Sequence, residues 1–322
     1  MDNMDNITIF TEFLLMDIST SRELQILQGL MFLLVFLGSL TGNLLTITVI
    51  VTDPHLHTPM HFFICNLSLI DLCSMTYALP KMIMNSLTGN KSITLIACAS
   101  QIFLFICFVS TEFFFLVVMS YDRYVAICHP LHYRLIITPR LCTQATCGSW
   151  TCGFVYSAIH TGNMFRLPFT KSNEIHQYFC DMPQILRISS SDIHFSETLV
   201  LTISSVIYLV CFAFLIKSYT DIFTMVLKMR SVEARNKALS TCTPQLAILI
   251  VFIISGYIAV FGPTANEASL SSLLTAIIYT MVPPLINPII YSLRNREINT
   301  AIGRMFHRCF EFPCRIFFDK KF

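Results

Sequence analysis

The chain has 322 residues, of which 54% are hydrophobic and only 12% are charged. This composition and a mean hydropathy of +0.66 exclude an ordinary soluble domain and indicate several membrane spans. The formal net charge of +2 gives no reason to expect a nucleic acid partner. We therefore expect an all-α membrane protein whose first partner is the lipid bilayer.

Apolar runs long enough to cross a bilayer follow one another along the chain. A hydrocarbon core about 30 Å thick needs roughly 20 apolar residues in a helix. Seven runs meet this need: 24–51, 59–85, 98–127, 141–165, 196–223, 237–262 and 271–292. We expect a seven-transmembrane helix bundle at 24–293, an N-terminal tail at 1–23, and an amphipathic helix and tail at 294–322.

Positive charges are unevenly distributed between the two sides of this bundle. With the N-terminus outside, most of the 21 Lys and Arg residues fall on the inner side. This bias satisfies the positive-inside rule and predicts an extracellular N-terminus and a cytoplasmic C-terminus. Asn6, in the sequence Asn6-Ile7-Thr8, is then a glycosylation acceptor. At the other end, Cys309 and Cys314 are either acylated at the inner leaflet or free.

Two cysteines lie near the outer face in this orientation. Cys98 stands at the start of the third run, and Cys180 stands in the longer outer segment 166–195. Because the compartment on that side is oxidising, we expect a Cys98–Cys180 disulfide. This bridge would hold the outer segment over the entrance of the third span.

An acid, a base and an aromatic residue stand together at the inner end of the third run, as Asp122, Arg123 and Tyr124. Charges are costly in the hydrocarbon core and tolerated at its edge. One interpretation is an interfacial ion pair that holds the span upright. The other is a polar switch that faces the cytoplasm.

Two carboxylates, Asp71 and Glu112, are placed deep inside the second and third runs. An unpaired charge is costly there, and intramembrane acids are usually functional. One interpretation is a sodium or water-filled pocket completed by Ser68 and Asn287. The alternative is that one or both acids are protonated and hydrogen-bonded. Beyond an allosteric sodium ion, we expect no cofactor.

Short motifs stand in five of the seven expected spans: one, two, three, four and seven. They are Gly42-Asn43, Leu67–Asp71, Asp122–Tyr124, Trp150 and Asn287–Tyr291. Together they resemble the rhodopsin-like G-protein-coupled receptors. A second set narrows the resemblance to the vertebrate olfactory receptors: Leu56–Met60, Met119–Tyr133, Ser218-Tyr219, Lys237–Cys242 and Pro284–Asn295.

The resemblance implies an odorant receptor rather than an enzyme. Its expected partners are a small volatile odorant and the olfactory stimulatory heterotrimeric G protein, which raises cAMP. Its expected place is the plasma membrane of olfactory neuron cilia. Arg123 would be restrained by Asp122 in the inactive state and released to meet the G protein and Tyr219. The resemblance adds three residues to this switch: Tyr124, Asn287 and Tyr291.

The expected ligand site lies in the outer halves of spans three, five, six and seven. Its candidates are Phe105, Ile106, Val109, Ser110, Ile203, Ser204, Ile207, Gly256, Tyr257, Val260, Ile277 and Thr280. For each of them, ordinary helix packing is the alternative. The set is nearly uncharged, so we expect a small, neutral, hydrophobic ligand with one hydrogen bond to Ser110, Tyr257 or Thr280.

The chain departs from the family pattern at several positions. A second pair of outer-loop cysteines is replaced by Thr170 and Ser190, which is consistent with the loss of a whole bridge. The usual His of span six is Gln245, and the usual Tyr after Pro59-Met60 is His61. These changes bear on the activation threshold rather than on the class of protein.

Other classes of protein fit the sequence less well. A transporter or channel would need a continuous polar path and usually an internal repeat, and neither is evident. A retinal protein would need a Lys in the segment 274–292, which contains none. The alternative that remains is a non-olfactory receptor for an internal metabolite.

Overall fold

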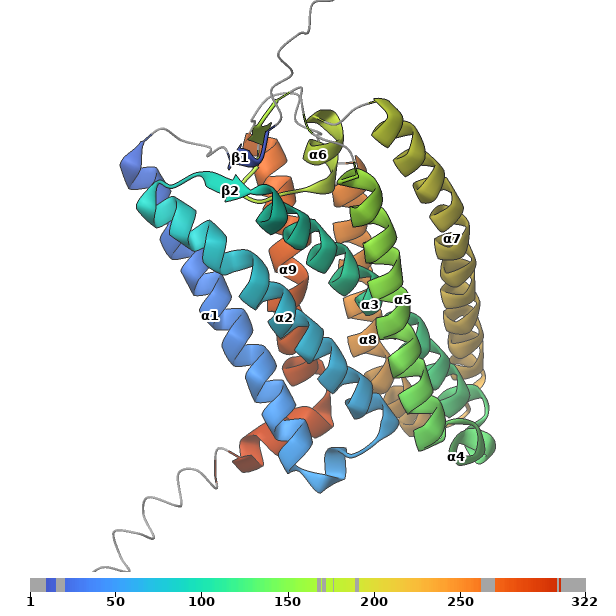
Figure 1. Cartoon of the computed structure of the whole chain (residues 1–322). Helices are drawn as coiled ribbons and strands as arrows, with labels where there is room; N and C mark the ends of the chain where they lie inside the picture. Colours follow the sequence, from blue (N-terminus) through green and yellow to red (C-terminus); the bar gives the residue numbers. More distant parts are fainter. Residues whose placement is uncertain are drawn as a thin grey trace, which may run out of the picture.

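Seven long helices run side by side in the computed structural model, which describes residues 10–15, 21–166, 169, 172–175, 177–188, 191–261, 270–305 and 307 (Figure 1). Within this described part they are α1 (Arg22–Thr52), α2 (Pro59–Thr88), α3 (Leu95–Cys128), α5 (Pro139–Met164), α7 (Ser191–Lys228), α8 (Val232–Phe261) and α9 (Leu270–Arg294). The expected all-α bundle is confirmed. Asn6, Thr170, Ser190, Cys309, Cys314 and the side chain of Val260 lie outside the described part.

The helices are not equally apolar. In the described residues, five of them are long and apolar enough to cross a membrane: α1, α2, α3, α7 and α8. Helix α9 contributes a shorter apolar stretch, Ile277–Tyr291. Helix α5 carries many small and weakly polar residues, and it packs extensively against α3.

Local sequence signals set several helix ends. Thr58 and Thr138 accept hydrogen bonds from backbone N–H groups in the first turns of α2 and α5, and Pro59 and Pro139 follow them. Threonine is a good N-cap, and proline suits the first helical position because its missing N–H has no intrahelical partner there. Gly89 ends α2 with a φ of 75°, a conformation that glycine adopts without steric cost.

A small sheet and a short helix lie at one end of the bundle (Figure 1). The strands are β1 (Glu12–Leu15), β2 (Ser92–Thr94) and β3 (Glu174–Ile175), in the order β2-β1-β3. Strand β1 is antiparallel to β2 and parallel to β3. The expected N-terminal tail thus contains a strand that links two outer loops. Helix α6 (Met182–Ile188) follows in the same outer segment.

The Cys98–Cys180 disulfide joins the start of α3 to this outer segment, with 5.3 Å between the two Cα atoms. The disulfide expected from the sequence is confirmed. It holds the residues around α6 over the end of the bundle.

The opposite end of the bundle carries the short connections. They are η1 (Pro54–Leu56), η2 (Pro130–His132) and α4 (Tyr133–Ile136). After α9, a further helical segment at 296–305 turns beneath α1 (Figure 1). Ile298 and Ala301 of this segment are buried, whereas Arg304 is exposed, as an amphipathic helix requires.

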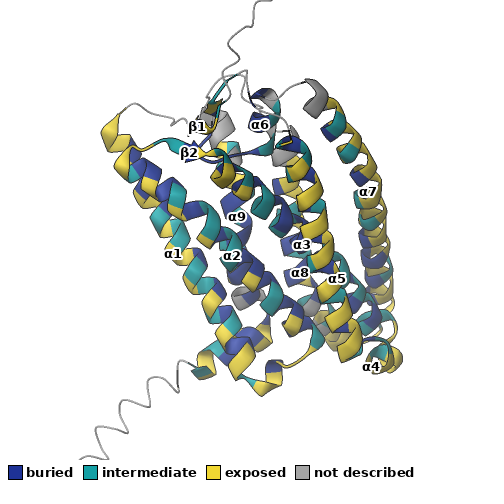
Figure 2. Ribbon diagram, in the orientation of Figure 1, coloured by how far each residue is buried: buried dark blue, intermediate teal, exposed yellow. Residues whose placement is uncertain are grey.

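Burial follows the arrangement expected of a membrane bundle. The faces that the helices turn toward one another are buried, and exposed residues lie on the outside of the bundle (Figure 2). Many of these exposed residues are large and apolar. Leu34 on α1 and Leu209 on α7 are 71% and 65% exposed. Large exposed apolar surfaces mark contact with another apolar medium, and here that medium is lipid.

Candidate functional site

A cavity of about 280 Å³ lies between the helices, below α6. It reaches from Met182 on α6 to Asp71 and Glu112 in the middle of the bundle, and its surface is mostly apolar. Six of the expected ligand residues line it: Phe105, Ile106, Val109, Ser110, Gly256 and Thr280. The structure therefore brings together the candidates on α3 with one each from α8 and α9.

Three expected ligand residues point away from the cavity instead. Ile203, Ile207 and Tyr257 are 60%, 54% and 64% exposed on the outside of the bundle. Successive residues of a helix are separated by about 100°, so a one-residue error in helix phase moves a side chain to another face. On α7 the cavity is lined by Tyr208, the residue next to Ile207.

Two further candidates lie near the cavity without lining it. Ser204 is buried on α7, and its hydroxyl donates to the Val200 carbonyl at 2.7 Å. Ile277 on α9 packs against a separate apolar cluster that contains Met75 and Met281.

The cavity also has polar residues outside the set expected from the sequence, namely Tyr156, His160 and Tyr208. Ser110 Oγ and the Tyr208 hydroxyl are 3.1 Å apart across the interface of α3 and α7. Tyr156 and His160 come from α5, and their ring centroids are 4.3 Å apart. Their spacing of four residues, in a helix otherwise rich in small side chains, is the one sequence signal that favours a shared cavity face.

His160 forms a buried pair with Glu197 on α7. The His160 Nδ1 atom contacts Glu197 Oε1, and the amide of Asn163 donates to Glu197 Oε2 at 2.8 Å. Both His160 and Glu197 are 1% exposed. Glu197 is thus a third intramembrane carboxylate, beyond the two found from the sequence.

The two acids expected from the sequence share one partner. The Asn287 amide on α9 donates to Asp71 Oδ2 at 3.1 Å and to Glu112 Oε1 at 3.3 Å. Ser68 Oγ and Asn287 Oδ1 are buried without hydrogen-bond partners in the described part of the chain. Asp71, Glu112 and Asn287 therefore meet in the middle of the bundle.

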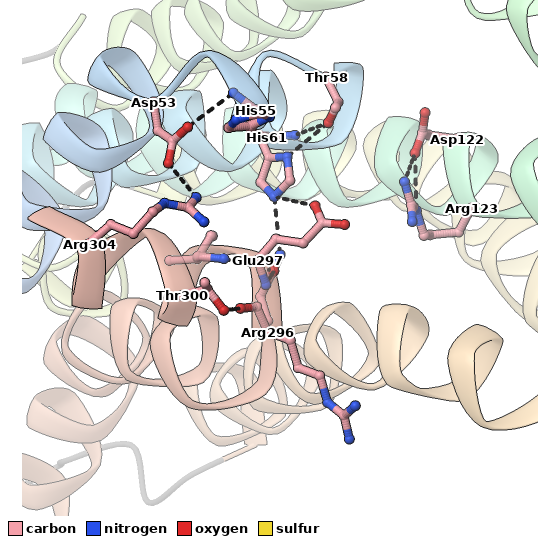
Figure 3. Close-up of polar contacts among 12 residues, drawn as sticks. Asp53, His55, Thr58, His61, Asp122, Arg123, Arg296, Glu297, Thr300 and Arg304 are labelled. Atoms are coloured by element: carbon pink, nitrogen blue, oxygen red, sulfur yellow. Dashed lines mark hydrogen bonds and ion pairs between the residues drawn. The ribbon is translucent and has the colours of Figure 1, made fainter. Parts of the chain in front are cut away.

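The Asp122–Arg123 pair is closed at the inner end of α3 (Figure 3). Arg123 donates to Asp122 Oδ2 at 3.0 Å through Nε and at 2.5 Å through one guanidinium nitrogen. The Tyr133 hydroxyl donates to Asp122 Oδ1 at 2.7 Å. Burial, followed by the charge of Asp122, raises the pKa of Tyr133, so this hydroxyl keeps its proton. Both oxygens of Asp122 are therefore occupied.

The remaining switch candidates surround this pair. Tyr219 and Tyr291 are buried, and their hydroxyls have no hydrogen-bond partner in the described residues. Tyr124 turns to His129, with its hydroxyl 3.3 Å from His129 Nε2. Arg123 is among the charged neighbours of Tyr219, whereas those of Tyr291 are Asp71 and Glu112.

Below the pair lies an inner cleft of about 1330 Å³, lined by Arg123 and Tyr133 and by residues after α9. Two polar links join the α1–α2 connection and the first turn of α2 to the segment 296–305 (Figure 3). Arg304 forms an ion pair with Asp53 at 2.5 Å, and its hydrogen bond lowers the pKa of Asp53. His61 Nε2 is 3.6 Å from a carboxylate oxygen of Glu297.

This arrangement of seven helices is the fold of the rhodopsin class. The crystal structure of squid rhodopsin matches it with a TM-score of 0.68, covering 91% of this chain and 88% of that one at 18% identity. The family model of the olfactory receptors matches residues 32–309. The chain therefore belongs to the olfactory receptor family, and it is a multi-pass membrane protein.

Human relatives cover nearly the whole chain. Olfactory receptor 14I1 is 50% identical over 303 residues, which are 94% of this chain and 97% of that protein. Olfactory receptor 14A16 is 43% identical over 302 residues, with the same two coverages. The similarity therefore extends over the outer loops, the cavity and the inner cleft together.

Proposed function

We propose that a small, neutral, hydrophobic odorant binds in the cavity between α3, α5, α7, α8 and α9. The observation that carries this proposal is the cavity itself, which is mostly apolar and is covered by the loop that the disulfide anchors. Small-molecule sites have this composition, with a few polar groups that orient the ligand. The volume of about 280 Å³ suits a small molecule rather than a peptide.

The response to the odorant is coupling to a stimulatory heterotrimeric G protein, followed by a rise in cAMP. The inner cleft supports this proposal because Arg123 lines it, on the side from which a cytoplasmic partner would approach. The closed Asp122–Arg123 pair is then the resting state. Activation frees Arg123 to contact the G protein and the unpartnered hydroxyl of Tyr219.

The switch needs only a modest preference of the odorant for the active state. Two states that differ by a few kcal/mol change population when a ligand favours one of them. The cavity reaches Asp71 and Glu112, which are linked to α9 through Asn287. A ligand in the cavity therefore acts on the same helix that carries Tyr291 toward the inner end.

A sodium ion held by Asp71, Glu112, Ser68 and Asn287 is part of this proposal. The unpartnered Ser68 and Asn287 oxygens support it, since a buried oxygen without a partner is costly. When bound, the ion supplies a positive charge between two acids. The four residues then hold α2, α3 and α9 in the resting arrangement.

The proposed location is the plasma membrane of olfactory neuron cilia, with the N-terminus outside. The positive-inside distribution of Lys and Arg supports this orientation. It places the inner cleft and the segment 296–305 in the cytoplasm.

The test is a cAMP assay in cells that express this chain with the olfactory stimulatory G protein, challenged with a broad panel of odorants. Surface staining verifies expression, and Arg123→Ala is the signalling control. The expected result is a response to at least one odorant that disappears in Arg123→Ala at equal surface staining. Silence of the well-expressed receptor across the panel would contradict the proposal.

A further inference from the structure

The α8 wall of the cavity carries a polar side chain between two apolar residues. Phe252, Ser255 and Gly256 line the cavity, and their spacing of three and four residues places them on one face of the helix. On the other face, Ile254 and Tyr257 are exposed on the outside of the bundle. Ser255 is buried, so its side chain lies on the face that α8 turns toward the cavity.

There is room for a ligand atom beside Ser255. A Cβ atom added at Gly256, the next residue, would meet nothing within 4 Å. Gly256 itself lines the cavity. A ligand in the cavity can therefore approach the α8 backbone closely at this point and reach the neighbouring hydroxyl.

The hydroxyl of Ser255 forms no hydrogen bond within the described part of the chain. Other buried serines donate to a carbonyl of their own helix, as Ser149 does to Ala145 at 2.9 Å. The Ser255 oxygen is also not enclosed by protein atoms, whereas the unpartnered hydroxyl of Tyr77 is. A hydroxyl without a partner in an apolar site costs free energy, so a ligand that supplies the partner gains affinity.

The hydroxyls from which the sequence predicts the ligand's hydrogen bond are engaged elsewhere. Ser110 hydrogen-bonds with Tyr208 at 3.1 Å, and Tyr257 is exposed outside the bundle. Thr280 lines the cavity, but it already has an interaction partner. Ser255 therefore takes the place that the sequence assigns to these three residues.

We propose that Ser255 anchors the ligand by a hydrogen bond and that the preferred ligand is an aliphatic alcohol. This inference rests on the proposed function, because it assigns the ligand class of the same cavity. A serine hydroxyl has one O–H group and two lone pairs. If the O–H turns toward its own helix, the lone pairs need a donor, and if it turns into the cavity, it needs an acceptor. An alcohol supplies both, whereas a ketone supplies only an acceptor.

The rest of the cavity suits the other parts of such a molecule. Its surface is mostly apolar, and the rings of Phe105, Phe108 and Phe252 contribute to it, so a hydrocarbon chain packs there without loss of a polar contact. Ser74 on α2 also lines the cavity, and its hydroxyl forms no hydrogen bond in the residues that the structure describes. A second free hydroxyl favours a ligand that both donates and accepts.

The experiment measures binding to the purified full-length receptor in nanodiscs. Affinity is taken from the shift of thermal unfolding with n-octane, methyl hexyl ketone and n-octanol, which have the same number of carbon atoms. The variants are Ser255→Ala, which removes the hydroxyl, and Ser255→Thr, which keeps it. Ser149→Ala is the matched control, since Ser149 is a buried serine that does not line the cavity. Each compound is compared between variants in the same lipid, so its effect on the bilayer is common to all of them.

The wild-type receptor is expected to bind octanol about tenfold more tightly than octane, the effect of one hydrogen bond in a buried site. Ser255→Ala should bring the two affinities together, while Ser255→Thr and Ser149→Ala retain the preference for octanol. The melting temperature without ligand verifies that each variant is folded. Equal wild-type affinities, a ketone bound more tightly than octanol, or an octanol preference that persists in Ser255→Ala would each overturn the inference.

The same compounds and the odorant panel are tested for cAMP in cells, which separates this inference from the proposed function. A receptor that responds to odorants without preferring the alcohol remains an odorant receptor, and only the inference fails. A surface-expressed receptor that neither binds nor responds to any compound would contradict both.

Discussion

The Tyr279 hydroxyl on α9 donates a hydrogen bond to the carboxylate of Asp181 in the outer segment. Asp181 follows Cys180, whose disulfide reaches α3. Tyr279 also lines the cavity, and its ring centroid is 6.0 Å from that of Phe105. The cover of the cavity is therefore fixed to α3 by a covalent bond and to α9 by a hydrogen bond.

This contact predicts a dependence of stability on pH. Burial raises the pKa of Asp181 from 3.8 to about 6, although the Tyr279 hydrogen bond acts in the opposite direction. Between pH 4 and 6 the unfolded chain loses this proton while the folded receptor keeps it. Stability should therefore fall by up to about 3 kcal/mol as pH rises through this window.

The measurement compares the melting temperature of the purified receptor with that of Asp181→Asn across this pH range. The difference between the two should change with pH, because the amide does not titrate. Tyr279→Phe should raise the pKa of Asp181 further, since it removes a hydrogen bond that favours the charged carboxylate. The fall in stability should then continue to a higher pH. A pH profile of Asp181→Asn identical to the wild-type profile would show that Asp181 does not titrate as described.

The hydrogen bond from Tyr133 to Asp122 predicts a change in basal activity. Tyr133→Phe frees one oxygen of Asp122 and weakens the closed state by about 1 kcal/mol, the typical worth of such a bond. The active population should then rise by roughly fivefold. Basal cAMP without odorant, normalised to surface expression, measures this change. An unaltered basal level would mean that Tyr133 does not restrain the switch.

The contact between α3 and α5 predicts a stability effect at Gly153. A Cβ atom at this position would lie 2.9 Å from the Cys107 carbonyl oxygen and would also overlap the side chain of Thr111. Gly153→Ala should therefore destabilise the receptor by about 1–3 kcal/mol through overpacking. The matched control is Gly162→Ala on the same helix, where nothing lies within 4 Å.

Gly162→Ala should leave the melting temperature unchanged or raise it slightly, because alanine favours the helix. The two variants differ only in position, so any general effect of alanine is common to both. Equal melting temperatures for Gly153→Ala and the wild type would show that α3 and α5 are packed less closely than described.

The acids around Asn287 predict a specific effect of sodium. If the ion binds between Asp71 and Glu112, sodium chloride should raise the melting temperature of the receptor relative to choline chloride at equal ionic strength. Asp71→Asn should lose most of this difference. Identical melting curves of the wild type in the two salts would support the hydrogen-bonded acids without an ion.

The sequence is sufficient to predict the helices and the disulfide, since both depend on local or compartmental signals. An apolar run of the right length predicts a span without knowledge of its neighbours. Only two cysteines, Cys98 and Cys180, stand near the oxidising face. The motif residues Asp122 and Arg123 are adjacent in the chain, so their pairing is also a local matter.

The polar wall of the cavity depends on helix rotation, which the sequence alone does not determine. His160 and Glu197 are separated by 37 positions and lie on different helices. A rotation of α7 about its axis by one residue would place Ile207 at the cavity instead of Tyr208. The same uncertainty explains why the sequence predicts Ile203 and Ile207 as ligand residues, although the structure turns them outward.

The proposed function requires that an odorant acts from within the cavity, and one pair of variants tests this directly. Val109→Phe places a ring inside the cavity, and Val155→Phe makes the same change on α5, where Val155 is 49% exposed outside the bundle. The measurement is the odorant dose dependence of cAMP at matched surface expression. Val109→Phe should raise the half-maximal concentration by at least about tenfold or abolish the response, while Val155→Phe should respond like the wild type. A wild-type response from Val109→Phe would contradict the cavity as the odorant site.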